Sequence, residues 1–526
     1  MAVGAGKAWL LLLLLSMAGS CSIASQGGQT VETIRQQDMA PQGMTHLRDA
    51  KKGKKVKVAK VPTEPPVGTR DFYPDEFARR SWLFESFRQV SKRFNFQEYD
   101  SPVLEHEVLY TRKSGEEITG QMYNFVDKDG YNVTLRPEMT PSLARMVISR
   151  EKELFFPLKW FSIPQCWRFE NVQRGRKREH YQWNMDIVGV KNVAAEAELI
   201  AATVSLFQSL GLGSGDVGIK VNSRKILNSA LKIMDVPDEN FSSICIILDK
   251  IDKIGRDRVV EDLESAHSLQ HDCSLNIVKI ASCTSLESLE ETIRDLKRET
   301  HAAVPELRAA IDELRQLFSL LDSHGVKDYV SFDASVVRGL AYYTGRGGRI
   351  VWEGFDLSGE FRAICGGGRY DNLMKLYGAQ HEIPCVGFGF GDCVIMEVLA
   401  KRNLLPKTMK TCDVVVAAYN QVFELRWNES CDVGAQQEML GHACSITSQL
   451  RQIFDYADRS GAYHMIFVAP DEIARGKVRI KALRGSFRGF KSLGGETYEI
   501  SEDGKQIDVP IGSIRHFIEE LYSSPS

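Results

Sequence analysis

Segments with the alternating or apolar pattern of β-strands follow one another through much of this chain, with few helical segments between them. Parallel strands need a long crossover connection, usually a helix, whereas antiparallel strands can be joined by short turns. The pattern therefore predicts an α+β fold built on an antiparallel sheet. We expect its strands at 97–105, 123–126, 132–136, 159–163, 165–170, 181–189, 329–334, 349–355, 361–365 and 385–390, and its helices at 76–94, 141–149, 194–210 and 392–403. A turn at Asp129 and Gly130 predicts that the strands at 123–126 and 132–136 form a hairpin.

Changes in pattern divide the 526 residues further. Residues 222–328 are mostly helical in pattern and carry few motifs, so we expect a helical insertion between two strand-rich parts, 63–221 and 329–404. From residue 410 to residue 526 short strands alternate with helices, at 414–417, 442–459, 465–469 and 479–483. This alternation predicts a separate small α/β domain.

The N-terminus has the composition of a targeting segment. Lys7 precedes an apolar run that is too short to span a membrane comfortably, so residues 1–22 resemble a cleavable signal peptide. Residues 23–62 are polar, basic and poor in acids, as in a transit segment. This two-part address predicts a plastid, with no stable membrane association once the signal is removed. The alternatives are a signal anchor, or an internal start at Met39 or Met44 that leads to the mitochondrion or the cytoplasm.

Charge and cysteine content exclude some classes of protein. The formal net charge is −3, so a nucleic-acid partner would need a local basic patch. The eleven cysteines are scattered without the spacing of a zinc site, which predicts reduced thiols and no metal site built from protein ligands alone.

Three polar motifs occur in the first strand-rich part. Leu135–Thr140 ends a strand with the carboxylate and hydroxyl that could bind an ammonium group. Trp167–Glu170 sets an arginine on a strand before the basic loop 174–180, and guanidinium groups suit phosphate oxygens. In the strand at 181–189, alternation puts Gln182, Asn184 and Asp186 on one face. The plainer alternatives are an exposed strand end and a solvated run of charges.

Two further motifs lie in the second strand-rich part. Val337–Gly345 combines one arginine, two tyrosines and two glycines, and Cys365–Asp371 adds three glycines, an arginine and a tyrosine. Glycines let a backbone approach a ligand closely, and a guanidinium attracts negative charge. Together these segments indicate a pocket for a small anionic ligand.

In this order the motifs resemble those of the histidyl-tRNA synthetases, which are class II aminoacyl-tRNA synthetases. The resemblance covers residues 67 to about 522. It implies a class II antiparallel sheet flanked by helices, in which 63–221 and 329–404 form the catalytic domain and 410–526 the anticodon-binding domain. It also implies L-histidine, ATP and tRNA(His) as substrates, Mg²⁺ with the β- and γ-phosphates, and a homodimer with Pro102 at the interface.

The resemblance assigns roles to individual residues. Arg168 and Arg338 would be catalytic, on the α-phosphate, and Arg168 would also hold the histidine carboxylate. Glu170 would bind the adenine amino group and Arg176 the outer phosphates, so that ATP is bound by Arg168, Glu170, Arg176 and Arg338. Histidine would be bound by Glu138, Met139, Thr140, Gln182, Asp186, Tyr342, Tyr343 and Tyr370.

Some positions differ from the family pattern. Val394 stands where relatives often have an arginine, so another group must contact the γ-phosphate of ATP, or ATP binds differently. Ala341 replaces an aspartate, and Asp186 replaces a glutamate. A catalytically inactive, synthetase-like regulatory or tRNA-binding protein is the main alternative, and a class II enzyme for glycine, proline or threonine is another. The segment Asp471–Lys481 is the best match to the anticodon-binding domain, and its basic residues either meet RNA phosphates or form a solvated face.

Overall fold

The computed structural model describes residues 61–111, 119–296, 302–336, 350–406, 414–418, 443–446, 450–487 and 498–523. The predicted targeting segments lie outside the described residues, apart from the last two positions of the second one. Arg338, Ala341, Tyr342 and Tyr343 also lie outside them.

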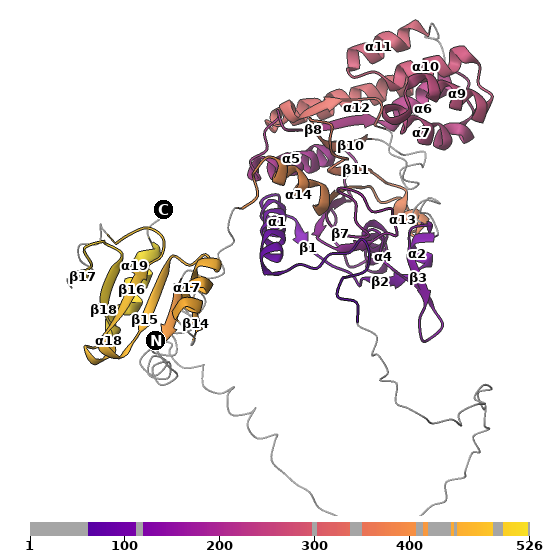
Figure 1. Ribbon diagram of the computed structural model, residues 1–526. Helices are drawn as coiled ribbons and strands as arrows, with labels where there is room; N and C mark the ends of the chain where they lie inside the picture. The colour runs from indigo at the N-terminus through magenta and orange to yellow at the C-terminus, as the bar shows by residue number, and fades with distance from the viewer. Residues whose placement is uncertain are drawn as a thin grey trace, which may run out of the picture. The chain divides into compact units, whose positions relative to one another are not determined.

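A nine-stranded sheet forms the centre of the larger body (Figure 1). Its neighbours are antiparallel from β5 to β8, while the two edge pairs, β1 with β5 and β8 with β9, are parallel. The predicted antiparallel α+β fold is therefore confirmed, with parallel edges. The strand order is β1 (Gln97–Glu98), β5 (Leu158–Ser162), β7 (Glu179–Val188), β12 (Cys385–Gly391), β11 (Cys365–Arg369), β10 (Ile350–Asp356), β8 (Val217–Ser223) and β9 (Val330–Phe332), and β6 (Gln165–Trp167) pairs with β7.

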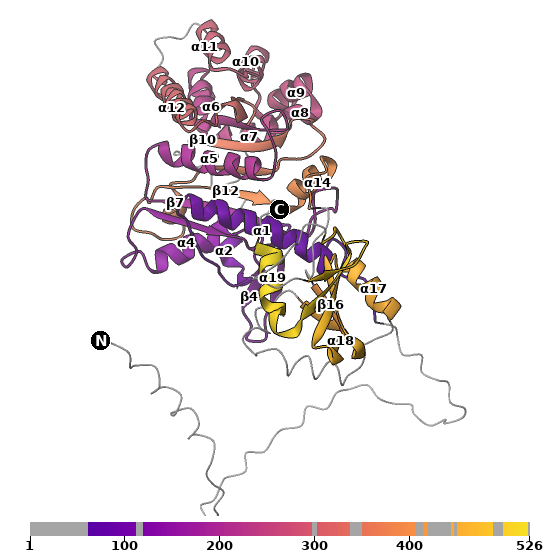
Figure 2. The ribbon, with the colours of Figure 1, turned by 90° about the vertical axis from the view of Figure 1, so that its left-hand side faces the viewer.

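Helices cover both faces of this sheet. On one face, α1 (Pro74–Arg93) and α5 (Ala194–Ser209) lie side by side, as Figure 2 shows, and α14 (Asp392–Lys401) packs beside β7. Trp183 is fully buried there and stacks on Phe87, with ring centroids 5.1 Å apart. The opposite face is covered by α4 (Thr140–Ser149) and α13 (Leu373–Leu376). Successive side chains of a strand point to opposite faces of the sheet. Because Trp183 points to the first face, Gln182, Asn184 and Asp186 point to the second.

A small antiparallel sheet lies beside the main one. Its order is β2 (Leu104–His106), β4 (Asn132–Leu135) and β3 (Tyr123–Val126), followed in the chain by α4, with the short helix α2 (Val108–Thr111) after β2. The predicted hairpin at 123–136 is confirmed by the pairing of β3 with β4, which ends at Leu135.

The helical segment between β8 and β9 is anchored on the main body. Its last helix packs on α5, and Leu314, Leu317 and Leu321 are buried in the same apolar core as Phe207. Leu248, Val259 and Leu263 belong to a second core of its own. Its helices are α6 (Arg224–Ile233), α7 (Phe241–Leu248), α8 (Ile251–Ile254), α9 (Arg256–His267), α10 (His271–Ala281), α11 (Leu286–Asp295) and α12 (Val304–Ser323).

The C-terminal domain has a six-stranded mixed sheet with helices on both faces. Helix α17 (Leu450–Arg459) packs on one face through Ile453 and Ala457, and α19 (Ile514–Ser523) on the other through Ile514 and Phe517. The helix α18 (Pro470–Ala474) precedes β16. The strand order is β14 (Ala443–Ile446), β13 (Val414–Ala418), β15 (His464–Val468), β16 (Lys477–Ala482), β18 (Gln506–Pro510) and β17 (Glu499–Ile500).

Several predicted elements were wrong in detail. The segment 97–105 is two short strands in different sheets, because Arg136 holds the chain between them by donating to the Ser101 carbonyl at 2.6 Å. The strand expected at 361–365 begins only at Cys365 and runs through the glycines. A side chain at Gly367 would overlap the Trp352 ring, so glycine is what lets this strand pack. β8 was not predicted, and residues 443–446 are a strand rather than part of a helix.

Among the described residues, no helix is both long and apolar enough to cross a membrane. Seven cysteines in the same part of the chain are free thiols, namely Cys166, Cys245, Cys273, Cys283, Cys365, Cys385 and Cys393.

Candidate active site

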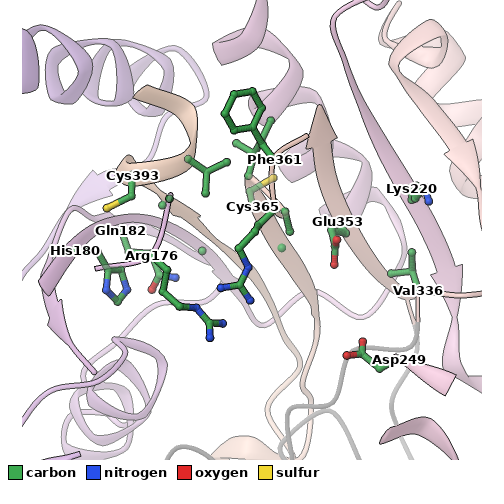
Figure 3. Close-up of a pocket in the computed structure, with 18 of the residues that line it drawn as sticks. Arg176, His180, Gln182, Lys220, Asp249, Val336, Glu353, Phe361, Cys365 and Cys393 are labelled. Carbon is green, nitrogen blue, oxygen red and sulfur yellow. The ribbon is translucent and has the colours of Figure 1, made fainter. Parts of the chain in front are cut away.

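A polar pocket of about 910 Å³ opens over the central strands of the main sheet, a size typical of small-molecule sites (Figure 3). Figure 3 shows Arg176, His180 and Gln182 on one side of it and Lys220 and Glu353 on the other. The cations that line the pocket are Arg168, Arg176, Lys177, Lys220 and Arg362, and the acids are Glu170, Asp249, Glu353 and Glu360.

Four of the predicted site residues line this pocket: Arg168, Glu170, Arg176 and Gln182. The Arg168 guanidinium is held in place from behind, since its Nε donates to the Pro137 carbonyl at 2.9 Å. Its backbone N–H donates to the carbonyl of Arg178 at 2.9 Å. The bond to Pro137 joins the motif Leu135–Thr140 to the motif Trp167–Glu170. The remaining N–H groups of the Arg168 guanidinium can face the pocket.

The basic loop after β6 forms a tight turn over the pocket. Gln173 and Arg176 exchange backbone hydrogen bonds, and Gly175 between them has φ +70°, which favours glycine. Arg176 pairs with Glu170 at 2.5 Å, and the Glu170 side chain is only 8% exposed. The arginine and the glutamate that were predicted to bind opposite ends of ATP therefore touch each other in this structure.

Glycines of β12 let the polar face of β7 approach closely. A Cβ at Gly389 would lie 2.5 Å from Nε2 of Gln182. A Cβ at Gly387 would overlap the Asp186 carboxyl and lie 2.8 Å from the Tyr370 hydroxyl. Real Cβ atoms do not approach so closely, so Gln182 would have to move if Gly389 were replaced, and Asp186 and Tyr370 if Gly387 were replaced. The glycines therefore fix where Gln182, Asp186 and Tyr370 can stand.

Asp186 is buried against Tyr370, whose hydroxyl donates a hydrogen bond to its carboxyl. Burial disfavours the carboxylate and raises the pKa of Asp186 to about 7, although the Tyr370 hydroxyl favours the charged form. Both residues are buried, and neither lines the 910 Å³ pocket.

Replacing Asp186 by asparagine should change how stability depends on pH. In the unfolded chain an aspartate ionises near pH 4, whereas the folded Asp186 stays protonated up to about pH 7. Wild-type stability therefore falls as pH rises through this window, by up to about 4 kcal/mol. Asp186→Asn should be more stable than wild type at pH 8, and the difference should shrink to about 1 kcal/mol near pH 4.5. Denaturant unfolding at both pH values measures this, and a difference that does not depend on pH would contradict it.

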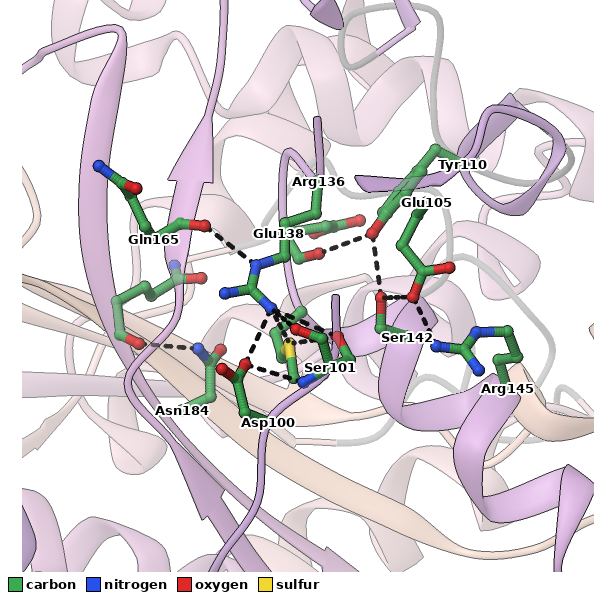
Figure 4. A network of polar contacts seen from close by, with 12 residues as sticks. Asp100, Ser101, Glu105, Tyr110, Arg136, Glu138, Ser142, Arg145, Gln165 and Asn184 are labelled. Carbon is green, nitrogen blue, oxygen red and sulfur yellow. Dashed lines mark hydrogen bonds and ion pairs between the residues drawn. The ribbon is translucent and has the colours of Figure 1, made fainter. Parts of the chain in front are cut away.

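Glu138 and Met139 are buried in a network of polar contacts between β4 and α4 (Figure 4). The Glu138 carbonyl accepts a hydrogen bond from Tyr110 at 3.2 Å, and Tyr110 also meets Ser142 at 3.1 Å. Arg136, 2% exposed, pairs with Asp100 at 2.9 Å. The network fixes the backbone that carries Glu138, Met139 and Thr140, although none of the three lines the 910 Å³ pocket.

Sequence reasoning missed several residues of the pocket, because single polar residues outside a motif give no pattern. His180 was seen only as the end of the basic loop. Burial and the charges of Arg168, Arg70 and Arg176 lower the pKa of His180 to about 3, so its ring is neutral at physiological pH. Asp249 comes from the helical segment, and Lys220 and Arg362 from strands or turns across the pocket.

The basic stretch of the C-terminal domain is largely paired with acids. Arg479 pairs with Asp508 at 2.8 Å and with Glu472 at 3.0 Å. Arg484 pairs with Asp458 at 3.2 Å. These contacts support the alternative of a solvated, internally paired face for this stretch.

No group of three or more His, Cys, Asp or Glu side chains in the described ranges could hold a metal ion by itself. Mg²⁺ is commonly bound by one or two carboxylates together with substrate phosphates, and such a mode needs no protein cluster. The carboxylates of the pocket wall suit that mode of binding.

Comparison with known proteins agrees with the geometry. A family model described as histidyl-tRNA synthetase matches residues 68–391. The chain is 44% identical over 427 residues to a chloroplastic/mitochondrial histidine–tRNA ligase of Arabidopsis thaliana, covering 81% of this chain and 84% of that one.

Solved structures share the fold. The histidyl-tRNA synthetase of Nostoc sp. PCC 7120 superposes with a TM-score of 0.69 at 22% identity, over 88% of this chain and all of that one (100%). An ATP phosphoribosyltransferase regulatory subunit/histidyl-tRNA synthetase from Bacillus halodurans C gives a TM-score of 0.61 at 20% identity, over 78% and 98%. From the family model and the sequence identity together, this chain belongs to the histidyl-tRNA synthetase family.

Proposed function

We propose that this chain is a histidine–tRNA ligase that activates L-histidine with ATP and transfers it to tRNA(His). The observation that carries the proposal is the placement of Arg168, whose guanidinium is fixed by the Pro137 carbonyl at the wall of a 910 Å³ pocket that Gln182 also lines. A fixed cation next to an amino-acid-binding face is what carboxyl activation at a phosphate requires.

In the first step, a carboxylate oxygen of histidine attacks the α-phosphorus of ATP. A P–O bond to histidine forms, the P–O bond to the β-phosphate breaks, and pyrophosphate leaves. Arg168 and Arg338 would stabilise the charge on the α-phosphate oxygens. Glu170 would accept from the adenine amino group and Arg176 would hold the outer phosphates. For both to act, the 2.5 Å pair between them must open when ATP binds.

Histidine would lie over the polar face of β7. Glu138, with Met139 and Thr140 beside it, would hold the α-amino group, and Gln182 would also contact the amino acid. Asp186 would face the imidazole, while Tyr342, Tyr343 and Tyr370 would form the walls. The hydrogen bond from Tyr370 orients the Asp186 carboxyl, which supports a role in recognising an N–H group. In the second step, the terminal hydroxyl of tRNA attacks the histidyl carbonyl and AMP leaves.

Mg²⁺ would accompany the phosphates of ATP and supply positive charge there when bound. Glu353 and Asp249 are among the carboxylates of the pocket wall that would hold it. The basic face of the C-terminal domain would contact the anticodon arm only after exchanging some of its internal ion pairs for phosphates.

We also propose a homodimer in a plastid. Apolar side chains stand exposed around the small sheet: Val103 (37%), Leu104 (45%), Val108 (63%), Phe125 (50%) and Val126 (62%). Exposed apolar groups gathered in this way are typical of an association surface, and sedimentation should give the mass of two chains.

The organelle is proposed from the composition of residues 1–62, and a fluorescent protein fused after residue 62 should enter plastids rather than mitochondria.

Charging of tRNA separates the proposed ligase from its alternatives. Incubation with labelled histidine, ATP and tRNA(His) should give an ester that is sensitive to mild base. Labelled glycine, proline and threonine with their own tRNAs should give none. A protein that binds tRNA(His) but forms no ester with any of them would be the inactive, synthetase-like protein instead.

A further inference from the structure

Val394 stands where members of the family often have an arginine. Val394 lies in the first turn of α14, is 7% exposed and lines the pocket. A Cβ at Gly175 would lie 3.2 Å from its Cγ2, so the tip of the basic loop packs directly on the valine. Its side chain has no donor for a phosphate. The pocket wall is therefore apolar at the point where a cation would be expected.

The segment that carries Arg362 runs beside this point. The backbone N–H of Gly391 donates to the Ile364 carbonyl at 3.3 Å, and that of Ile364 donates to the Gly354 carbonyl at 2.8 Å. Val394 lies three residues after Gly391, and Arg362 lies two residues before Ile364. Residues 362 and 394 are therefore each within three residues of a backbone hydrogen bond that joins their two segments. Arg362 is exposed and lines the same pocket as Val394.

Two other cations near this point, Lys220 and Arg174, are less well placed. Lys220 is on β8, which β10 and β11 separate from β12, so it starts about 14 Å from the β12 edge. Arg174 pairs with Glu397 at 3.0 Å and lies over the Phe361 ring at 4.8 Å, on the outer side of the same segment.

We propose that Arg362 binds the terminal phosphate of ATP in the role that an arginine at position 394 would have. This inference rests on the proposed function, because it assumes that ATP occupies the pocket. A guanidinium gives a fork of N–H donors that matches two phosphate oxygens. The chain would then still have an arginine at this part of the pocket. It would come from the segment before β11 instead of from α14.

Binding of ATP and ADP to the whole protein without histidine tests this directly. The wild type should prefer ATP to ADP, because only ATP has the terminal phosphate. In Arg362→Ala the affinity for ATP should fall on the order of 10- to 100-fold, as expected for a lost hydrogen-bonded charge pair, while the affinity for ADP changes little. Arg362→Gln, which keeps most of the side chain, should show the same loss of preference.

Lys401→Ala is the matched control. Lys401 pairs with Glu360 at 2.6 Å next to the same segment but does not line the pocket, so its loss removes one positive charge without removing a phosphate ligand. It should leave the preference for ATP over ADP unchanged, because the loss of its pair with Glu360 acts on both nucleotides alike. An ATP preference that survives in Arg362→Ala and Arg362→Gln overturns the inference and leaves the proposed function intact. Wild-type protein that supports no histidine-dependent ATP–pyrophosphate exchange overturns the proposed function instead.

Discussion

Alanine in place of Arg168 should slow histidine-dependent ATP–pyrophosphate exchange by about 10²- to 10³-fold, the cost typical of removing a fixed group that stabilises charge in a transition state. The Arg168 guanidinium is held by the Pro137 carbonyl at 2.9 Å, so it needs no rearrangement as charge builds on the α-phosphate. The rate at saturating ATP and histidine measures the effect. Arg338→Ala should abolish the same exchange while leaving the fold intact.

Arg88→Ala is the control for Arg168→Ala. Arg88 lies on α1 and pairs with Glu98 at 3.2 Å, with about a third of its side chain exposed (36%) and no part in the pocket lining. Its replacement should leave exchange within about two-fold of wild type, since exposed ion pairs contribute little. An Arg168→Ala variant that is as active as Arg88→Ala would remove Arg168 from the reacting centre.

Alanine in place of Glu196 should lower the free energy of unfolding by about 3–5 kcal/mol, because it leaves the buried Arg369 guanidinium with only a 3.3 Å contact to Asp371 as counter-charge. Arg369 on β11 and Glu196 on α5 are both 0% exposed and meet through two 2.6 Å contacts. Arg369 also donates to the Val190 and Asn192 carbonyls, so it ties α5 to the sheet. Denaturant unfolding followed by tryptophan fluorescence measures the change, because Trp183 and Trp352 are fully buried in this body.

Glu198→Ala on the same helix provides the comparison. Glu198 pairs with Lys159, and both side chains are partly exposed at 30% and 24%. Solvent screens such a pair, so its loss should cost less than about 1 kcal/mol. If both variants lost the same free energy of unfolding, burial of the Arg369–Glu196 pair would not explain its contribution to stability.

The sequence predicted the elements whose pattern is local. The alternation around Trp183 and Met185 predicted which face of β7 is polar, and the turn at Asp129 and Gly130 predicted the β3–β4 hairpin. β11 was misplaced because glycines carry no strand propensity of their own, and the need for Gly367 arises only from Trp352 on the neighbouring strand.

The site could be predicted from the sequence only through its motifs. Those motifs identified Arg168, Glu170, Arg176 and Gln182, which the fold brings together at one pocket. They gave no indication of Arg362, a single arginine in a loop, because its place in the pocket wall depends on how the segment before β11 lies against β12. The raised pKa of Asp186 likewise depends on burial that no local pattern records.

The most direct test of the proposed ligase is ATP–pyrophosphate exchange measured with each proteinogenic amino acid in turn. The account predicts exchange that depends on histidine and on no other amino acid. Absence of exchange with every amino acid, or exchange driven by glycine, proline or threonine, would contradict it.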